Sequence, residues 1–153
     1  PIITICTRSK EPVKNWATSS WINLINKLSE KFIVIQLGDG SEPRLDKVIR
    51  LAGKLSMRES AAIVQHSKLF IGPDSLLMHI ANGLGIKSII IFGGSRPVPS
   101  FGYDENININ STPKCSPCWI HKCDSSCPYD LECLNDISVK KVWDSIRLMN
   151  IRI

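Results

Sequence analysis

Short apolar segments alternate with helix-like segments along most of the chain, and this alternation limits the possible folds more than any other feature. Runs rich in Ile, Val, Leu and Phe have the length and composition of buried strands at residues 2–6, 32–37, 68–71 and 88–92. Apolar residues spaced three and four apart predict helices over residues 18–28, 45–49, 58–66, 75–83 and 138–149. Strands that alternate with helices form right-handed βαβ units. The sequence therefore predicts an α/β fold: a Rossmann-like parallel sheet with helices on both faces.

The composition fits one globular domain and excludes several other classes of protein. Of 153 residues, 43% are hydrophobic and 22% are charged, so the chain is long enough to bury a core and is not a disordered segment. No apolar run reaches the roughly 18 residues that a membrane-spanning helix needs. The net charge of +5 comes from scattered Lys and Arg residues, which suits anionic ligands and gives no reason to expect a nucleic-acid partner.

The first residues of the chain have the pattern of a strand and not that of a targeting segment. Pro1 stands at the start of a strand pattern, and the segment is too short for a signal peptide. We therefore expect a piece of a longer cytoplasmic protein. Its positive charge also allows peripheral association with the inner face of the cytoplasmic membrane.

A polar cluster follows the third predicted strand, at the start of the next predicted helix. Asp74 or Ser75 is expected to be the N-cap, and Ser75 and His79 lie four residues apart on one helix face. A helix N-terminus offers unpaired N–H groups and a positive dipole end, so it favours an anion such as a diphosphate. The alternative is that Asp74 only caps the helix and His79 is an ordinary core or surface imidazole. In parallel sheets ligands bind at the carboxyl ends of the strands, which is where this cluster lies.

Residues 96–136 lack periodicity and contain most of the cysteines, so we expect an irregular excursion there. Five of the six cysteines fall in the pattern Cys-x2-Cys-x4-Cys-x3-Cys-x5-Cys between residues 115 and 133. Two thiolates in Cys-x2-Cys reach one tetrahedral metal, and a nearby pair completes four ligands for zinc or iron. Disulfides and uncoordinated thiols are the alternatives. The preferred structural metal site consists of Cys115, Cys118, Cys127 and Cys133, with Cys123 or His121 as substitutes.

Several motifs, in order, resemble glycosyltransferase family 9, the ADP-heptose lipopolysaccharide heptosyltransferases. They are Lys14-Asn15-Trp16, the Gly-rich loop that ends in Glu42, the segment 51–62, the helix start at 72–85 with its following strand, and the cysteine-bearing tail. Each motif is weak alone, but five in the right order are specific. The resemblance covers nearly the whole chain.

The resemblance implies that residues 1–153 form the C-terminal, donor-binding half of a glycosyltransferase-B fold, with a Cys-rich loop at about 111–136. The N-terminal acceptor domain is then absent from this chain. Lys14 would bind the donor diphosphate and Glu42 the ribose hydroxyls. Asp74, Ser75 and His79 would place the pyrophosphate or sugar near the helix N-terminus. Without the family, Lys14 reads as a solvated loop lysine and Glu42 as a turn carboxylate.

The implied reaction is inverting transfer of a heptose or related sugar from a nucleotide diphosphate sugar, ADP-heptose in this family. The implied acceptor is a lipopolysaccharide core or another glycan or glycolipid. The resemblance implies no catalytic metal, because Lys14 and the helix terminus would stabilise the leaving group. The catalytic base belongs to the N-terminal half, so this chain alone holds none and is expected to be inactive. Leu76-Leu77 replace the usual Gly-Pro and are expected to narrow the donor pocket.

Two other functions stay open at this point. A non-catalytic domain would use the cysteine-bound metal for oligomerisation or partner binding and keep only a vestigial nucleotide site. A nucleotide-sugar epimerase of related fold would need acids and bases that the sequence does not supply. The sequence does not fix the oligomeric state.

Overall fold

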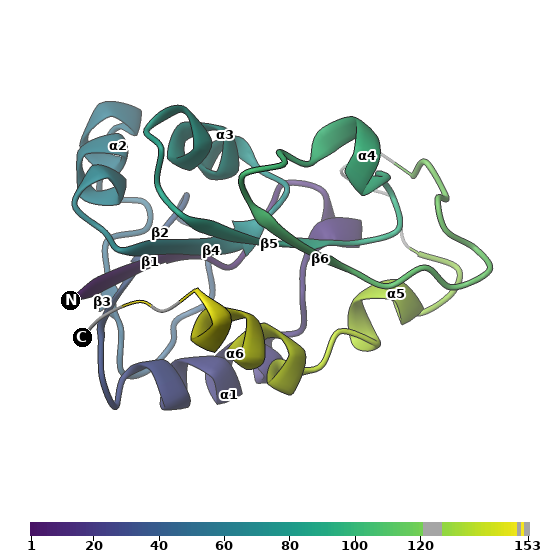
Figure 1. Cartoon of the computed structure of the whole chain (residues 1–153), viewed down its shortest axis with the longest axis horizontal. Coiled ribbons are helices and arrows are strands. Elements are labelled where there is room, and N and C mark those ends of the chain that lie inside the picture. The colour runs from purple at the N-terminus through teal and green to yellow at the C-terminus, as the bar shows by residue number, and fades with distance from the viewer. Residues whose placement is uncertain (121–126, 150, 152–153) are drawn as a thin grey trace.

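The computed structural model describes residues 1–120, 127–149 and 151, which form a six-stranded parallel sheet between two layers of helices (Figure 1). The strands are β1 (Ile2–Cys6), β2 (Ile33–Leu37), β3 (Ile49–Arg50), β4 (Leu69–Pro73), β5 (Ser88–Phe92) and β6 (Ile107–Asn110). Their order in the sheet is β3-β2-β1-β4-β5-β6, and every neighbouring pair is parallel. The predicted Rossmann-like sheet is confirmed.

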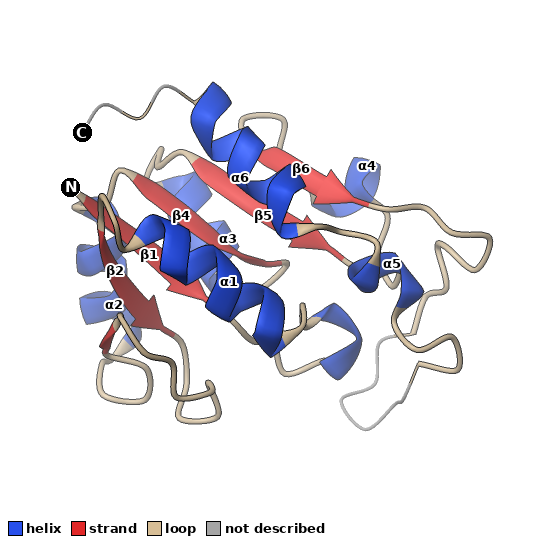
Figure 2. Cartoon of the chain, turned by 90° about the horizontal axis from the view of Figure 1, so that it is seen from below, coloured by secondary structure: helices blue, strands red, loops and turns tan. Residues whose placement is uncertain are grey.

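Helices cover both faces of this sheet, as predicted. On one face lie α2 (Met57–Gln65), α3 (Leu76–Gly83) and α4 (Val98–Phe101), and on the other lie α1 (Thr18–Leu28), α5 (Glu132–Asn135) and α6 (Val139–Leu148) (Figures 1 and 2). A short 3-10 helix, Pro12–Lys14, follows β1. Among the described residues, no helix has the length and apolar character to cross a membrane.

The core consists of two apolar clusters, one on each face, because alternate residues of each strand point to opposite sides. In β1, Ile3 and Ile5 join the cluster under α1 and α6, whereas Cys6 joins the cluster under α2 and α3. Strands buried on both faces need apolar residues at nearly every position. This requirement explains the continuous apolar runs in the sequence.

Two sequence-based expectations are wrong. Residues 45–49 form no helix: the chain turns there, with Lys47 in the left-handed region at φ 60°, and then pairs with β2 as the short edge strand β3. Residues 96–136 are not irregular throughout, since they contain α4, β6 and α5. Asn residues alternate with Ile107 and Ile109 in β6, and Asn disfavours strands, so the pattern is weak. The backbone pairing of β6 with β5 therefore stabilises this strand, because the strand preference of its own residues is weak.

The strand order changes direction between β1 and β4. From β1 the chain proceeds to β2 and β3 on one side, and it then crosses to β4, β5 and β6 on the other. The loops that leave β1 and β4 therefore lead toward opposite sides of the sheet. In such sheets ligands bind outside the carboxyl ends of these two strands, and we call this place the crevice. In Figure 2 these ends point away from the N-terminus, toward the end of the molecule that carries α5.

Candidate functional site

The loop that follows β1 is held in place by two side chains. Trp16 packs edge-on against Trp21 at 5.3 Å between ring centres and donates its indole N–H to the carbonyl of Ile137 at 3.0 Å. Asn15 closes the loop by accepting from the Ser9 N–H at 2.7 Å and donating to the Ser9 carbonyl at 3.2 Å. The residue just before these two anchors is Lys14, so its position is fixed by the fold.

Lys14 forms a buried ion pair across the crevice with Asp74. Its Nζ lies 2.9 Å from Asp74 Oδ2 and 3.2 Å from Glu11 Oε1, and only 8% of its side-chain surface is exposed. Arg96, in the loop after β5, lies 3.4 Å from Glu11 Oε1 and 3.7 Å from Asp74 Oδ2. Two cations and two carboxylates thus join the loops that follow β1, β4 and β5. We call Glu11, Lys14, Asp74 and Arg96 the charge cluster.

Sequence reasoning identified two members of the charge cluster, Lys14 and Asp74, and missed Glu11 and Arg96. The position of Arg96 could have identified it as a site residue. Arg96 lies in the loop that begins with Gly93-Gly94 directly after a buried strand, at the edge of the sheet where ligands bind. Gly93 is required there, because a Cβ would lie 2.7 Å from the Val13 carbonyl. Glu11 carries no comparable signal.

Glu42 ties the Gly-rich loop to the end of β1. Its carboxylate accepts the Thr7 N–H at 2.9 Å, the Arg8 N–H at 3.2 Å and the Thr7 hydroxyl. Burial raises the pKa of Glu42, and the bonds from Thr7 oppose that rise. Gly38, at φ +131°, leaves the room this side chain occupies, since a Cβ there would overlap the carboxylate. Glu42 therefore stands at the crevice as an anchor, and its predicted contact with ribose stays a prediction.

Of the two residues expected as the N-cap of α3, Ser75 occupies that position. Neither the Ser75 side chain nor that of Asp74 makes a capping hydrogen bond to the helix. Asp74 turns to Lys14 instead. The Ser75 hydroxyl is buried and has no hydrogen-bond partner among the described residues, whereas burial and the neighbouring Glu42 raise the pKa of the Cys6 thiol. The first-turn N–H groups of α3 consequently have no side-chain cap among the described residues, and they face the crevice end of the sheet.

His79 is set apart from the charge cluster. Its imidazole is exposed, and Nδ1 lies 2.8 Å from the hydroxyl of Tyr103, with the two rings edge to face. Tyr103 belongs to the segment between α4 and β6. The structure thus brings Lys14 and Asp74 together, whereas Glu42 bonds to the end of β1 and His79 pairs with Tyr103.

The two leucines that open α3 have different environments. Leu77 is 8% exposed and packs in the core cluster that contains Phe70 and Met78, whereas Leu76 is 54% exposed. The expectation that both side chains narrow the donor pocket is therefore wrong for Leu77. Its side chain is needed in the core, because the second residue of this helix faces the sheet.

The Cys-rich loop docks on the residues that follow β5. Cys133 Sγ accepts the Gly94 N–H at 3.0 Å, and the Cys118 N–H donates to the Gly94 carbonyl at 2.9 Å. Burial raises the pKa of Cys133, and Cys127, Cys115 and Cys118 raise it further. The four cysteines of the expected set therefore occupy one region.

The five described cysteines are free thiols, and Cys123 and His121 lie outside the described residues. Four soft sulfur donors suit zinc or iron, and an N–H bond to Cys133 Sγ suits a thiolate ligand. Within residues 1–120 and 127–149, however, no group of three or more His, Cys, Asp or Glu residues is arranged to hold a metal ion. The metal site stays a prediction.

Comparisons with known proteins bear on this site. The family model for glycosyltransferase family 9 (heptosyltransferase) matches residues 1–128. Lipopolysaccharide heptosyltransferase 1 of Pseudomonas aeruginosa is 23% identical over 120 residues, which are 72% of this chain and 34% of that protein. The iron-containing dodecameric glycosyltransferase TibC of enterotoxigenic E. coli superimposes with a TM-score of 0.83 at 22% identity, over 96% of this chain and 44% of TibC.

TibC in complex with ADP-D-β-D-heptose gives a TM-score of 0.81 at 24% identity, again over 96% of this chain and 44% of TibC. The chain thus spans less than half the length of these relatives. Its fold matches that of glycosyltransferase-B structures. The family match extends from β1 through the crevice loops to the Cys-rich loop. The chain belongs to glycosyltransferase family 9, the heptosyltransferase family.

Proposed function

We propose that this chain is the donor-binding half of an inverting glycosyltransferase that moves a heptose, or a related sugar, from a nucleotide diphosphate sugar to a glycan acceptor. ADP-heptose is the proposed donor, and a lipopolysaccharide core or another glycan is the proposed acceptor. Family membership and the TibC complex with ADP-D-β-D-heptose support the donor class.

The observation that carries the proposal is the buried Lys14–Asp74 pair, which joins the loops after β1 and β4 where the strand order changes direction. Nucleotides bind at this point in doubly wound sheets. Close to it, α3 begins without a side-chain cap, so its N–H groups are available to a diphosphate. A lysine and a helix terminus in one crevice form a site for the charged part of a nucleotide sugar.

The proposed chemistry is a single displacement. An acceptor hydroxyl loses its proton to a base outside this chain, and its oxygen attacks the anomeric carbon. The bond from that carbon to the diphosphate oxygen breaks, and the nucleoside diphosphate leaves with the electron pair. Lys14 and the N–H groups of α3 would stabilise the charge that develops on the leaving group.

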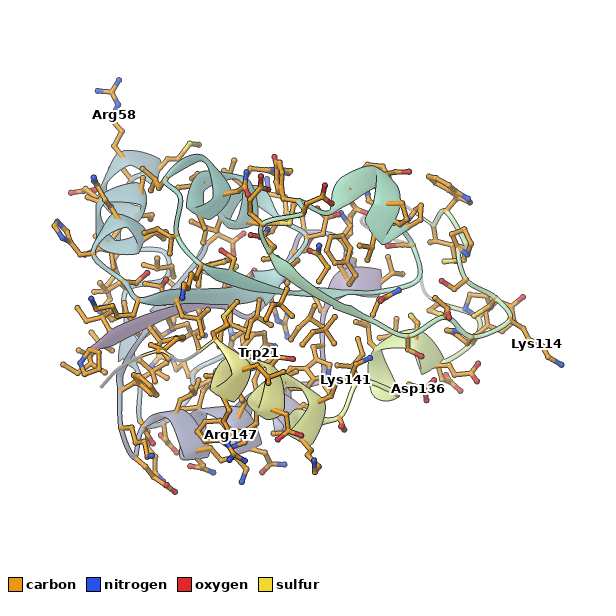
Figure 3. The ribbon with its side chains drawn as sticks, viewed as in Figure 1. Trp21, Arg58, Lys114, Asp136, Lys141 and Arg147 are labelled. Carbon is orange, nitrogen blue, oxygen red and sulfur yellow. The ribbon has the colours of Figure 1, made fainter. Side chains whose placement is uncertain are left out.

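Isothermal titration calorimetry of the complete protein with ADP-heptose, ADP and other nucleotide sugars tests this function. We expect ADP and ADP-heptose to bind, and Lys14→Met to weaken both. Arg58→Gln, which removes an exposed cation on α2, should change neither (Figure 3). An absence of binding at millimolar ligand, in the complete protein and in this chain, would rule the proposal out.

We also propose that Cys115, Cys118, Cys127 and Cys133 hold a structural zinc or iron ion, a proposal supported by their shared location and by the iron in TibC. The ion would brace the loop that contacts Gly94 and would take no part in the chemistry. Metal analysis of the purified protein, followed by donor titration before and after chelation, tests this. Less than one metal per two chains, in protein purified without chelator, would contradict it.

A further inference from the structure

The charge cluster poses a problem for the proposed donor site. Lys14 Nζ already contacts two carboxylates, at 2.9 Å and 3.2 Å, and the cluster of two cations and two carboxylates carries no net charge. A diphosphate that approaches Lys14 would also approach Asp74 and Glu11, which repel it. The site therefore needs a cation whose present contacts are weak enough to be exchanged for the ligand.

Arg96 is that cation. Its Nη2 lies 3.4 Å from Glu11 Oε1, and its Nε lies 3.7 Å from Asp74 Oδ2, too far for a hydrogen bond. Its side chain is 26% exposed, compared with 8% for Lys14 and 9% for Asp74. Arg96 is thus the outermost and most loosely held charge of the cluster, and its buried Nε–H makes no hydrogen bond to any residue that the structure describes.

The surroundings of Arg96 hold the guanidinium in position. Its Cζ lies 4.6 Å from the ring centre of Phe101, the stacked arrangement that a planar guanidinium favours. Two residues earlier, the peptide groups of Gly94 are bonded on both sides by Cys133 and Cys118. The intervening Ser95 is 2% exposed, and its hydroxyl has no hydrogen-bond partner in the described part of the chain. A fixed loop with two unused polar groups is suited to a ligand.

We propose that Arg96 binds the diphosphate of the nucleotide-sugar donor, exchanging its long contacts with Glu11 and Asp74 for phosphate oxygens while Phe101 keeps the guanidinium in place. Lys14 then stays paired with Asp74, and Arg96 supplies the forked donor that matches a phosphate. This inference rests on the proposed function, and it adds a residue that the family motifs in this sequence do not include.

Calorimetry on the complete protein tests the role of Arg96, with ADP as the probe and adenosine as the phosphate-free comparison. We expect Arg96→Gln to weaken ADP binding by about fivefold or more, because a charged hydrogen-bond donor is lost, and to leave adenosine binding unchanged. Arg58→Gln is the matched control, since it removes an arginine that points away from the fold (Figure 3). A smaller loss for ADP, or an equal loss for adenosine, overturns the inference.

A second variant covers the case in which Arg96→Gln does not fold. Arg96→Lys keeps the positive charge beside Glu11 and Asp74 but lacks the fork, so we expect it to fold and to bind ADP about threefold or more weakly. A dissociation constant for ADP that rises less than about threefold in Arg96→Lys overturns the inference. Failure of the wild-type protein to bind ADP is a different result, because it refutes the proposed function itself.

Discussion

Replacing Lys14 with Met should destabilise the chain strongly, because it removes one partner of a buried ion pair. At the observed 2.9 Å, the attraction between Lys14 and Asp74 is about 6 kcal/mol at an effective dielectric constant of about 20. Desolvation of the two charges offsets much of this, and loss of one partner from a buried pair costs about 3–5 kcal/mol. Because Arg96 stays 3.7 Å from Asp74, we expect the lower value, about 3 kcal/mol.

Urea unfolding of the 153-residue chain, followed by the fluorescence of the buried Trp16 and Trp21, measures this loss. A loss of about 3 kcal/mol in the free energy of unfolding corresponds to a fall in Tm of about 6–12 °C for a chain of this length. The double variant Lys14→Met, Asp74→Asn separates the pair from other effects. It should lose about 2 kcal/mol less than the sum of the two single variants, because each single variant leaves one buried charge of the pair without its partner and the double variant leaves neither. Additive losses, or a Lys14→Met variant within about 1 kcal/mol of wild type, would refute the reasoning.

Two further predictions concern the anchor formed by Glu42. The pKa of Glu42 is raised in the folded chain, so the folded state keeps the Glu42 proton to higher pH than the unfolded state does. The free energy of unfolding of the wild type, relative to that of Glu42→Gln, should therefore be greatest near pH 4 and fall toward neutral pH. Urea unfolding over a pH series measures this, and a difference that rises with pH contradicts it. Gly38→Ala should cost about 2–3 kcal/mol, since its φ is +131° and a Cβ would overlap Glu42, whereas Gly83→Ala, which meets open space, should stay within about 1 kcal/mol of wild type in the same assay.

The parts of the fold that follow from local chemistry were predictable. Strands β1 and β5 were predicted with their observed bounds, because a strand buried on both faces needs an unbroken apolar run. Four of the five helices that rest on apolar spacing were predicted to within one residue at each end, namely α1, α2, α3 and α6. In contrast, β6 was missed because its Ile-Asn alternation carries little strand preference and its pairing with β5 decides its structure.

The candidate site was predictable in its location and only partly in its contacts. The positions of Lys14 and Asp74 after strands placed both at the crevice. That the two side chains bind each other could not be predicted, because it depends on the packing of loops 60 residues apart in the sequence. The same holds for Arg96 and Glu11, 85 residues apart. Such pairs are set by the tertiary fold, which no local pattern encodes.

The hydrogen bond from Trp16 to Ile137 determines where this unit can be cut. The family match ends at residue 128, so a fragment designed from it would omit both Ile137 and the helix that begins two residues later, at Val139. The indole of Trp16 would then lose its acceptor, and the loop that carries Lys14 would lose its anchor on that face. The boundary of the folded unit therefore lies beyond the boundary of sequence similarity, and a minimal unit must retain Ile137 and α6.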